Sequence, residues 1–353
     1  MSPRPEADPS TTQSISPSVI LRWKQIATSR ENIILGVNIL FCFYLFFTSE
    51  RDSFFGQSNF LNLSRQIAML AIFAIGEAIV IISGGIDLSV GSIIGVTGMF
   101  MGLMLNGFVN RGMIPNIAIL VSCVAVLLIA LLIGIIQAGF IHFFRLPPFV
   151  VTLASLTLLR SVARISNNEL PIDLEGFHPL VALGNSSLFH GTIYAIPLPV
   201  IIVLPLVILA AWVMKRTRTG RYVYALGGNE EAARLSGISI FKIKAFAYGA
   251  SGLFAGVAGI LYAGYTRQGY ADSGSGGELV AITAAVIGGC SLSGGEGSVY
   301  GAVIGACLVN IITTAINLSS IPRPSEWQGV IVGIILLFTV IVNSLSRRIF
   351  ERR

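Results

Sequence analysis

Long runs without a charged residue limit this chain to a membrane-spanning fold. Six such runs approach or exceed the roughly 20 residues that cross a bilayer as an α-helix. They are 32–49, 112–141, 191–214, 245–266, 297–322 and 327–346. The chain of 353 residues is 54% apolar and 11% charged, whereas soluble domains carry about 25% charged residues. The sequence therefore predicts an all-α integral membrane protein.

Shorter apolar stretches between these runs raise the predicted number of transmembrane helices to ten, some of them interrupted by glycine. The predicted spans are 31–48, 64–83, 88–105, 116–140, 148–164, 193–214, 245–265, 278–290, 299–317 and 327–345. We expect a cytoplasmic N-terminal tail (1–30), a transmembrane domain (31–346) and a cytoplasmic C-terminal tail (347–353). The first 18 residues lack the apolar core of a signal peptide.

The distribution of charge predicts the orientation of the chain. Basic residues gather in alternate connecting segments and at both ends, and the densest cluster lies in residues 215–244. The intervening loops carry acidic residues such as Glu50, Asp173 and Asp272. Because cytoplasmic loops are enriched in Lys and Arg, we expect both termini and 215–244 to be cytoplasmic. The formal net charge of +6 therefore indicates a bilayer partner and no nucleic acid.

No residue pattern predicts an enzyme or a metal site. The four cysteines lie in apolar segments without paired spacing, and the three histidines are scattered. A P-loop for ATP needs a lysine directly after a glycine, and none of the lysines has that position. We therefore predict that the chain binds no cofactor or metal itself and that a separate protein supplies any energy.

A glycine-rich motif occurs twice, each time between two predicted spans. Residues 84–89 (GGIDLS) are echoed by residues 288–293 (GGCSLS), and a Gly-Ser pair follows each copy. Repeated glycine-interrupted segments are typical of broken helices beside a transport site. The predicted gating or hinge residues are Gly84, Gly85, Asp87, Gly288 and Gly289.

The acidic residues of these segments allow a second interpretation. Asp87 precedes the predicted helix 88–105 and is a good N-cap residue, so capping stands beside a gating contact as its role. Glu278 and Glu296 flank the second glycine-rich segment and allow the same two interpretations.

Three motifs carry a resemblance to a known family. They are GGIDLSVGS at 84–92, YALGGNEEAARLSGI at 224–238 and GGELVAITAAVIGGCSLSGGEGS at 276–298. Together they resemble the permease subunit of bacterial ATP-binding cassette (ABC) importers for monosaccharides of the ribose, xylose, arabinose and galactose type, from about residue 31 to 346. The resemblance implies two permease chains, two cytoplasmic ATPases that use ATP and Mg, and a periplasmic sugar-binding protein.

The second motif resembles the sequence by which importer permeases contact their ATPase. Glu231, Ala232 and Ala233 would form a short helix that Gly237 ends, and this helix would dock in a groove of the ATPase. The hydrophobic-Leu-Pro tail of the broader importer motif is missing here. The resemblance therefore implies an ATPase-coupling role for these four residues without specifying their contacts.

One acidic residue stands in the middle of the second predicted span. Glu77 lies eleven positions after Gln66, so the two differ by about 20° around a helix, and Phe73 lies one turn before Glu77. This polar and aromatic stripe predicts a substrate pathway, because intramembrane carboxyl groups commonly mark functional sites. The alternative is a structural glutamate, protonated or paired with Arg160.

The sequence thus predicts a permease subunit of an ABC importer that moves a monosaccharide, or a related polyol, across the bacterial inner membrane by alternating access. The second permease chain is either an identical copy or a paralogue. An ion-coupled secondary sugar transporter and a permease of the branched-chain amino acid type remain as alternatives. The basic segment 215–244 disfavours the first alternative, since a secondary transporter does not need it.

Overall fold

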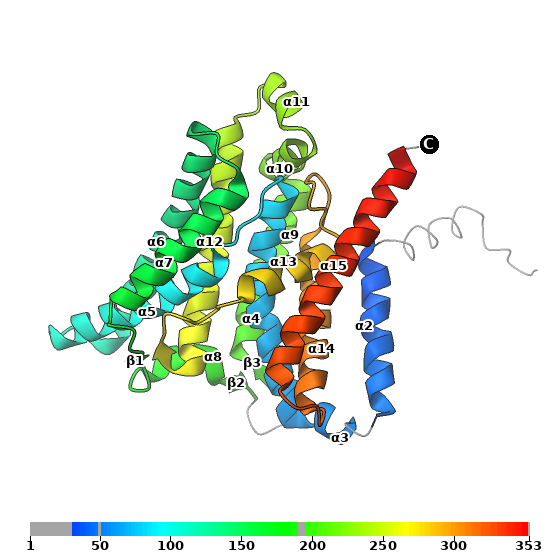
Figure 1. The fold of residues 1–353 in the computed structure, drawn as a ribbon. Coiled ribbons are helices and arrows are strands. Elements are labelled where there is room, and N and C mark those ends of the chain that lie inside the picture. Colours follow the sequence, from blue (N-terminus) through cyan, green and yellow to red (C-terminus); the bar gives the residue numbers. More distant parts are fainter. Residues whose placement is uncertain (1–29, 49–50, 190–194, 352–353) are drawn as a thin grey trace, which may run out of the picture.

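A computed structural model describes residues 30–48, 51–189 and 195–351 of the chain. These residues form a bundle of helices with two small two-stranded sheets (Figure 1). The helices are α2 (Arg30–Phe46), α3 (Arg51–Phe54), α4 (Gln57–Ile82), α5 (Val90–Asn110), α6 (Pro115–Phe143), α7 (Pro148–Ile165), α8 (His178–Asn185), α9 (Leu198–Arg216), α10 (Arg218–Gly228), α11 (Glu230–Leu235), α12 (Ile240–Thr266), α13 (Gly277–Ile287), α14 (Val299–Leu318) and α15 (Pro324–Glu351).

The strands are short and connect helices at one end of the bundle. β1 (Ile172–Asp173) pairs antiparallel with β4 (Gln268–Gly269), and β2 (Ser187–Leu188) pairs antiparallel with β3 (Ile196–Pro197). Figure 1 shows these strands with α3 and α8 at the bottom of the view, while α10, α11 and the C-terminal end of α15 lie at the top. We name these two ends the α3 end and the α11 end.

Seven of the described helices are long and apolar enough to cross a membrane: α4, α5, α6, α7, α9, α12 and α14. The other three predicted spans coincide with α2, α13 and α15, whose apolar parts are shorter. α13 has 11 residues, a length of about 16 Å at 1.5 Å per residue, and cannot cross the roughly 30 Å of a hydrocarbon core alone. The number of ten spans therefore remains a prediction.

Burial separates the central helices from those at the periphery. α4 is enclosed on all sides from Ala68 to its end, where Ile72, Ile75 and Ile82 are 0% exposed. α12 packs against α4, α5 and α6. α6 instead exposes large apolar side chains such as Leu120 and Leu132. Because a hydrocarbon solvent accepts such side chains, the outer faces of the bundle suit a lipid environment.

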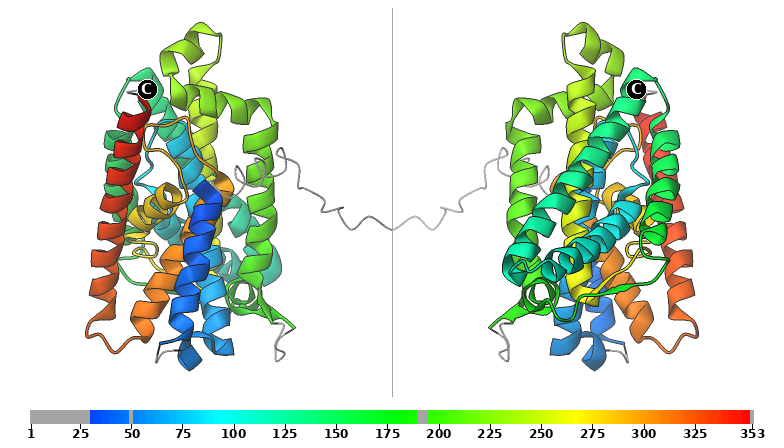
Figure 2. Two further views of the ribbon diagram at one scale, coloured as in Figure 1. Left: turned by 90° about the vertical axis from the view of Figure 1, so that its right-hand side faces the viewer. Right: turned by 90° about the vertical axis from the view of Figure 1, so that its left-hand side faces the viewer.

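The polar segment 215–244 is folded into helices rather than into an irregular loop. α9 continues to Arg216, α10 and α11 follow, and α12 begins at Ile240. The Thr217 hydroxyl accepts a hydrogen bond from the Gly220 amide at 3.2 Å and so caps α10. Figure 2 shows α11 as the outermost element of this end of the bundle in two further views.

Candidate functional site

The two glycine-rich segments, 83–89 and 288–298, meet beside α10. The amide nitrogen of Gly295 donates to the carbonyl oxygen of Ile82 at 2.9 Å, which joins the second segment to the end of α4. The Tyr224 hydroxyl on α10 donates to the carbonyl oxygen of Gly297 at 2.9 Å. A Cβ atom on Gly227 would collide with the carbonyl oxygen of Ile82. The segments that echo each other in sequence therefore share one contact region in space.

The four predicted hinge glycines lie within these segments but differ in what they require. Gly84 and Gly289 have φ angles of 85° and 95°, which side chains rarely adopt. A Cβ atom on Gly85 would meet the hydroxyl of Tyr248, and one on Gly288 would meet the backbone of Gly301. Backbone conformation therefore requires glycine at Gly84 and Gly289, whereas close packing requires it at Gly85 and Gly288. Their gating role remains a prediction.

Asp87 is fully buried in the turn that precedes α5. α5 begins at Val90, two residues later than the sequence predicts, and Ser89 has the N-cap position without a capping bond from its own side chain. One oxygen of Asp87 accepts hydrogen bonds from the Ser89 amide at 2.9 Å and the Ser89 hydroxyl at 2.6 Å. The other accepts from the Ser251 hydroxyl of α12 at 2.8 Å. Asp87 therefore closes the turn before α5 and attaches it to α12.

Glu77 is also fully buried, and it belongs to the same polar cluster. Its Oε1 accepts a hydrogen bond from the Asp87 amide at 3.2 Å. The pairing with Arg160 that we considered as an alternative is not present. Arg160 instead donates to the carbonyl oxygens of Ala271 and Ser273. Glu77 thus connects α4 to the 83–89 segment.

The other two acidic residues near the second segment are placed differently. Glu278 lies in the first turn of α13, where its Oε1 accepts a hydrogen bond from the Gly276 amide at 3.2 Å. The carbonyl oxygen of Glu296 accepts from the Ser291 amide at 3.0 Å, which closes the turn of the 288–298 segment.

α11 has the local geometry that its sequence predicts. The Asn229 side chain accepts a hydrogen bond from the Ala232 amide at 2.9 Å and caps the N-terminus. At the other end, Gly237 has a φ of 80°, and its amide donates to the carbonyl oxygen of Arg234 at 3.0 Å. This arrangement with a left-handed glycine terminates the helix.

The two faces of α11 have different environments. Ala233 is buried against the bundle, whereas Glu231 and Leu235 are exposed, Leu235 to 79%. The Glu231 carboxylate lies 2.7 Å from Arg234 and raises the pKa of that guanidinium through a hydrogen bond and charge attraction. The outer face therefore presents an apolar side chain beside a charged pair.

An ion pair attaches α11 to α12. The Nζ atom of Lys244 lies 2.9 Å from both carboxylate oxygens of Glu230. The Lys244 side chain is 14% exposed and the Glu230 side chain 54%. A partly buried pair is less screened by solvent than a surface pair, so α11 is held to the start of α12.

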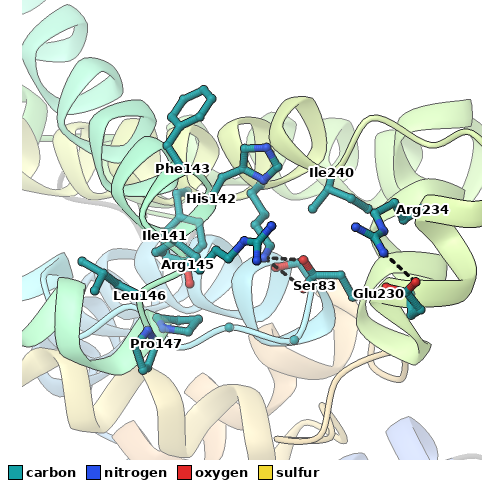
Figure 3. A pocket seen from close by; sticks show the side chains of 16 residues that line it. Ser83, Ile141, His142, Phe143, Arg145, Leu146, Pro147, Glu230, Arg234 and Ile240 are labelled. Atoms are coloured by element: carbon teal, nitrogen blue, oxygen red, sulfur yellow. Dashed lines mark hydrogen bonds and ion pairs between the residues drawn. The ribbon is translucent and has the colours of Figure 1, made fainter.

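A cavity of about 820 Å³ lies at the α11 end, between α11, α12, the end of α4 and the α6–α7 connection. Charged side chains from three elements line it, and Figure 3 shows Arg145 and Glu230 projecting into it from opposite sides. Arg234 and Lys244 also line it, as does the Ser83–Gly85 backbone. A displacement of α11 would therefore change the shape of this cavity, one wall of which is the first glycine-rich segment.

A second cavity, of about 750 Å³, lies toward the α3 end between α4, α12, α13, α14 and α15. Gln66 and Phe73 line it, whereas Glu77 is not among the residues that line either cavity. The three residues of the predicted stripe on α4 therefore have different environments: Gln66 and Phe73 line the cavity, whereas Glu77 is buried in the protein interior. A substrate pathway along Gln66 and Phe73 remains a prediction.

Within the described ranges, no three His, Cys, Asp or Glu side chains come together as metal ligands. The four cysteines are free thiols.

Several residues of the site had no predicted role. Gln137 donates to the Ser89 hydroxyl at 2.7 Å, and Ser251 and Tyr248 contribute from α12. The sequence could have indicated Gln137 as a site residue, since amide side chains are uncommon inside an apolar run. Gly227 lies within the quoted motif at 224–238, but its partner Ile82 is distant in sequence, so no local pattern indicates their contact.

The chain is similar in sequence to known transport proteins. Residues 59–340 match the family described as branched-chain amino acid transport system / permease component. The ribose import permease protein of Escherichia coli (strain K12) is 37% identical over 297 residues, which cover 83% of this chain and 87% of that protein. The ribose import permease protein of Haemophilus influenzae is 36% identical, covering 82% and 86%. The xylose transport system permease protein of the same organism is 28% identical, covering 90% and 96%.

Proposed function

The chain belongs to the family of branched-chain amino acid transport system permease components, and from this membership we propose that it is the membrane-spanning subunit of an ATP-driven monosaccharide importer. It is a multi-pass protein of the inner membrane. Relatives named as ribose and xylose permeases, each matched over more than four fifths of the chain, support a sugar as the cargo. The proposed cargo is a monosaccharide or a related polyol of similar size.

The observation that carries the proposal is the connection from α11 to both glycine-rich segments. α11 presents Leu235 and Glu231 outward, as a helix that docks in a partner's groove does. Only Asn229 separates it from α10, whose Gly227 and Tyr224 contact both segments. Force applied to α11 therefore reaches the two turns that begin α5 and α14.

The proposed cycle assigns the energy source to a partner chain. A cytoplasmic ATPase binds ATP and Mg and moves α11, which lies on the cytoplasmic side. The helices then alternate between an outward and an inward opening, and each state must make different contacts for ATP to shift their populations. A periplasmic sugar-binding protein delivers the cargo, and a second permease chain, identical or paralogous, completes the assembly.

The test replaces Glu231 and Gly237 together in a cell that expresses the complete importer. We expect the double variant to insert in the membrane at wild-type amount, to lose copurification with the ATPase and to lose uptake of labelled sugar. An Arg218→Gln variant, which changes a basic residue at the start of α10, is the control and is expected to retain both. Full uptake by the double variant would refute the assignment of α11.

The family description itself favours one second candidate, a branched-chain amino acid as the cargo. Uptake of labelled leucine by the same cells separates the two candidates. ATP-dependent leucine uptake without uptake of any monosaccharide would support the amino acid.

A further inference from the structure

Apart from Asp272, the polar side chains that line the cavity toward the α3 end are uncharged. Most of these uncharged side chains come from four different helices: α4, α12, α14 and α15. The residues on which the inference depends are Gln66, Tyr265, Asn310, Thr313, Asn317 and Gln328. Ligand cavities of about 300–1,000 Å³ typically combine apolar walls with a few such groups, and at about 750 Å³ this cavity lies within that range.

The amide side chains already use part of their hydrogen-bonding capacity within the protein. Gln328 donates from Nε2 to the Asn317 side-chain oxygen at 2.6 Å, which links α15 to α14. Asn310 donates to the carbonyl oxygen of Ala306 at 3.0 Å. An amide has two donors and one acceptor oxygen, so Asn317 retains its donors and Gln328 and Asn310 retain their oxygens. The cavity offers donors and acceptors side by side, as a hydroxyl group requires.

Charge distinguishes this cavity from the one at the α11 end. Its lining residues include no lysine, arginine or histidine. The carboxylate among them, Asp272, accepts hydrogen bonds from Nε and Nη2 of Arg164 at 3.1 and 2.7 Å. The lining thus presents no cation to an incoming carboxylate, and its acid is already paired. A zwitterionic amino acid would leave its own charges without partners, at a cost that an uncharged ligand avoids.

The apolar walls add aromatic rings to this arrangement. Phe73 of α4 and Tyr262 and Tyr265 of α12 line the same space. Rings of this kind cover the apolar faces of a ligand while amides and hydroxyls fix its orientation. A polyhydroxylated ring, which has C–H faces and O–H edges, matches both surfaces.

We propose that this cavity is a binding site for an uncharged polyhydroxylated ligand of monosaccharide size, on the side of the bundle opposite α11. The proposal rests on the function proposed above and adds to it a site within one permease chain and a reason to prefer a sugar over an amino acid. Binding there is weak, because a passage must release what it binds.

The experiment measures weak binding to the full-length permease alone, in lipid nanodiscs without its binding protein. Saturation-transfer NMR uses ribose, xylose and myo-inositol as uncharged probes, and leucine and gluconate as charged ones. We expect a signal from at least one uncharged probe and none from leucine or gluconate. A signal from leucine alone, or no signal from any uncharged probe, overturns the proposal.

Two variants assign the signal to this cavity. Gln66→Leu removes an amide from the lining, and Thr313→Val removes a hydroxyl with little change of volume. Each is expected to reduce the NMR signal at least fivefold. Thr97→Val is the matched control, because Thr97 donates to the carbonyl four residues earlier, as Thr313 does, but does not line this cavity. Loss of signal in Thr97→Val but not in the two cavity variants would overturn the assignment.

A labelling measurement keeps the proposal testable where a variant folds poorly. Gln66→Cys is expected to react with a membrane-impermeant thiol reagent added from the periplasmic side, whereas Leu204→Cys, on the exposed apolar face of α9, is not. Failure of Gln66→Cys to react, in folded protein, contradicts an outward-opening site. Sugar uptake by the complete importer is measured separately. Sugar uptake by the importer, together with an unchanged NMR signal in Gln66→Leu and Thr313→Val, refutes this site alone. Absence of all sugar uptake refutes the proposed function.

Discussion

The carbonyl oxygen of Ile82 accepts a hydrogen bond from the amide of Gly295 at 2.9 Å, across 213 residues of chain. This bond joins the end of α4 to the segment that precedes α14. Gly227 of α10 lies against the same carbonyl group with no space for a side chain. α10, which α11 directly follows, therefore contacts the junction of the two glycine-rich segments, and the following predictions test what this junction does.

Replacing Gly227 with alanine is expected to disrupt the junction. Its Cβ atom would collide with the Ile82 carbonyl, and overpacking of this kind costs about 1–3 kcal/mol. We expect a lower melting temperature in detergent and loss of sugar uptake. The matched control is Gly228→Ala, whose Cβ atom would meet nothing within 4 Å and which is expected to retain both. Equal behaviour of the two variants would contradict the proposed contact.

Alanine at Gly84 and at Gly288 is expected to have different effects, although the sequence alone predicts the same effect for both. At Gly84 a Cβ atom would lie 3.5 Å from the Gly227 Cα, an ordinary contact, but the φ of 85° is strained for alanine by about 1–2 kcal/mol. At Gly288 the Cβ atom would collide with the Gly301 backbone. Transport should therefore fall more than stability in Gly84→Ala.

In Gly288→Ala, stability and transport should fall together, because α13 and α14 can no longer pack. Melting temperature and initial uptake rate, each normalised to the amount of protein in the membrane, provide the comparison. A stable and inactive Gly288→Ala variant would assign the hinge to this position instead.

Glu77→Gln is expected to retain stability and transport, and Glu77→Leu to lose both. Glutamine keeps the oxygen that accepts the Asp87 amide, whereas leucine leaves that buried N–H group without its partner, at about 1–3 kcal/mol. Thermal unfolding and uptake of both variants check this. Wild-type stability in Glu77→Leu together with lost transport would favour the substrate pathway that the sequence suggested for this residue.

The Glu230–Lys244 pair is expected to hold α11 in the orientation that couples it to the partner. Glu230→Lys and Lys244→Glu should each reduce sugar-dependent ATP hydrolysis by the complete importer, and the double exchange should restore part of it. The pair is partly exposed, so the coupling energy in this cycle is expected to be about 0.2–1 kcal/mol and to fall with added salt. Additive effects of the two single variants would show that the Glu230–Lys244 interaction does not contribute to coupling.

The sequence by itself determined where the apolar helices lie and how α11 begins and ends. Every predicted span overlaps a helix, because an apolar segment in a membrane has to satisfy its backbone hydrogen bonds within itself. The ends of α11 depend on Asn229 and Gly237, whose hydrogen bonds are to residues three or four positions away, so the local sequence is sufficient to predict them.

Only the tertiary structure decided which of these elements touch. Helical periodicity places Gln66 and Glu77 on one side of α4, but α4 packs against several other helices, and each position along it meets a different neighbour. Gln66 therefore lines a cavity while Glu77 binds the Asp87 amide. Ile82 and Gly295 are brought together by the packing of whole helices. That packing depends on contacts between residues far apart in the chain, which no local pattern encodes.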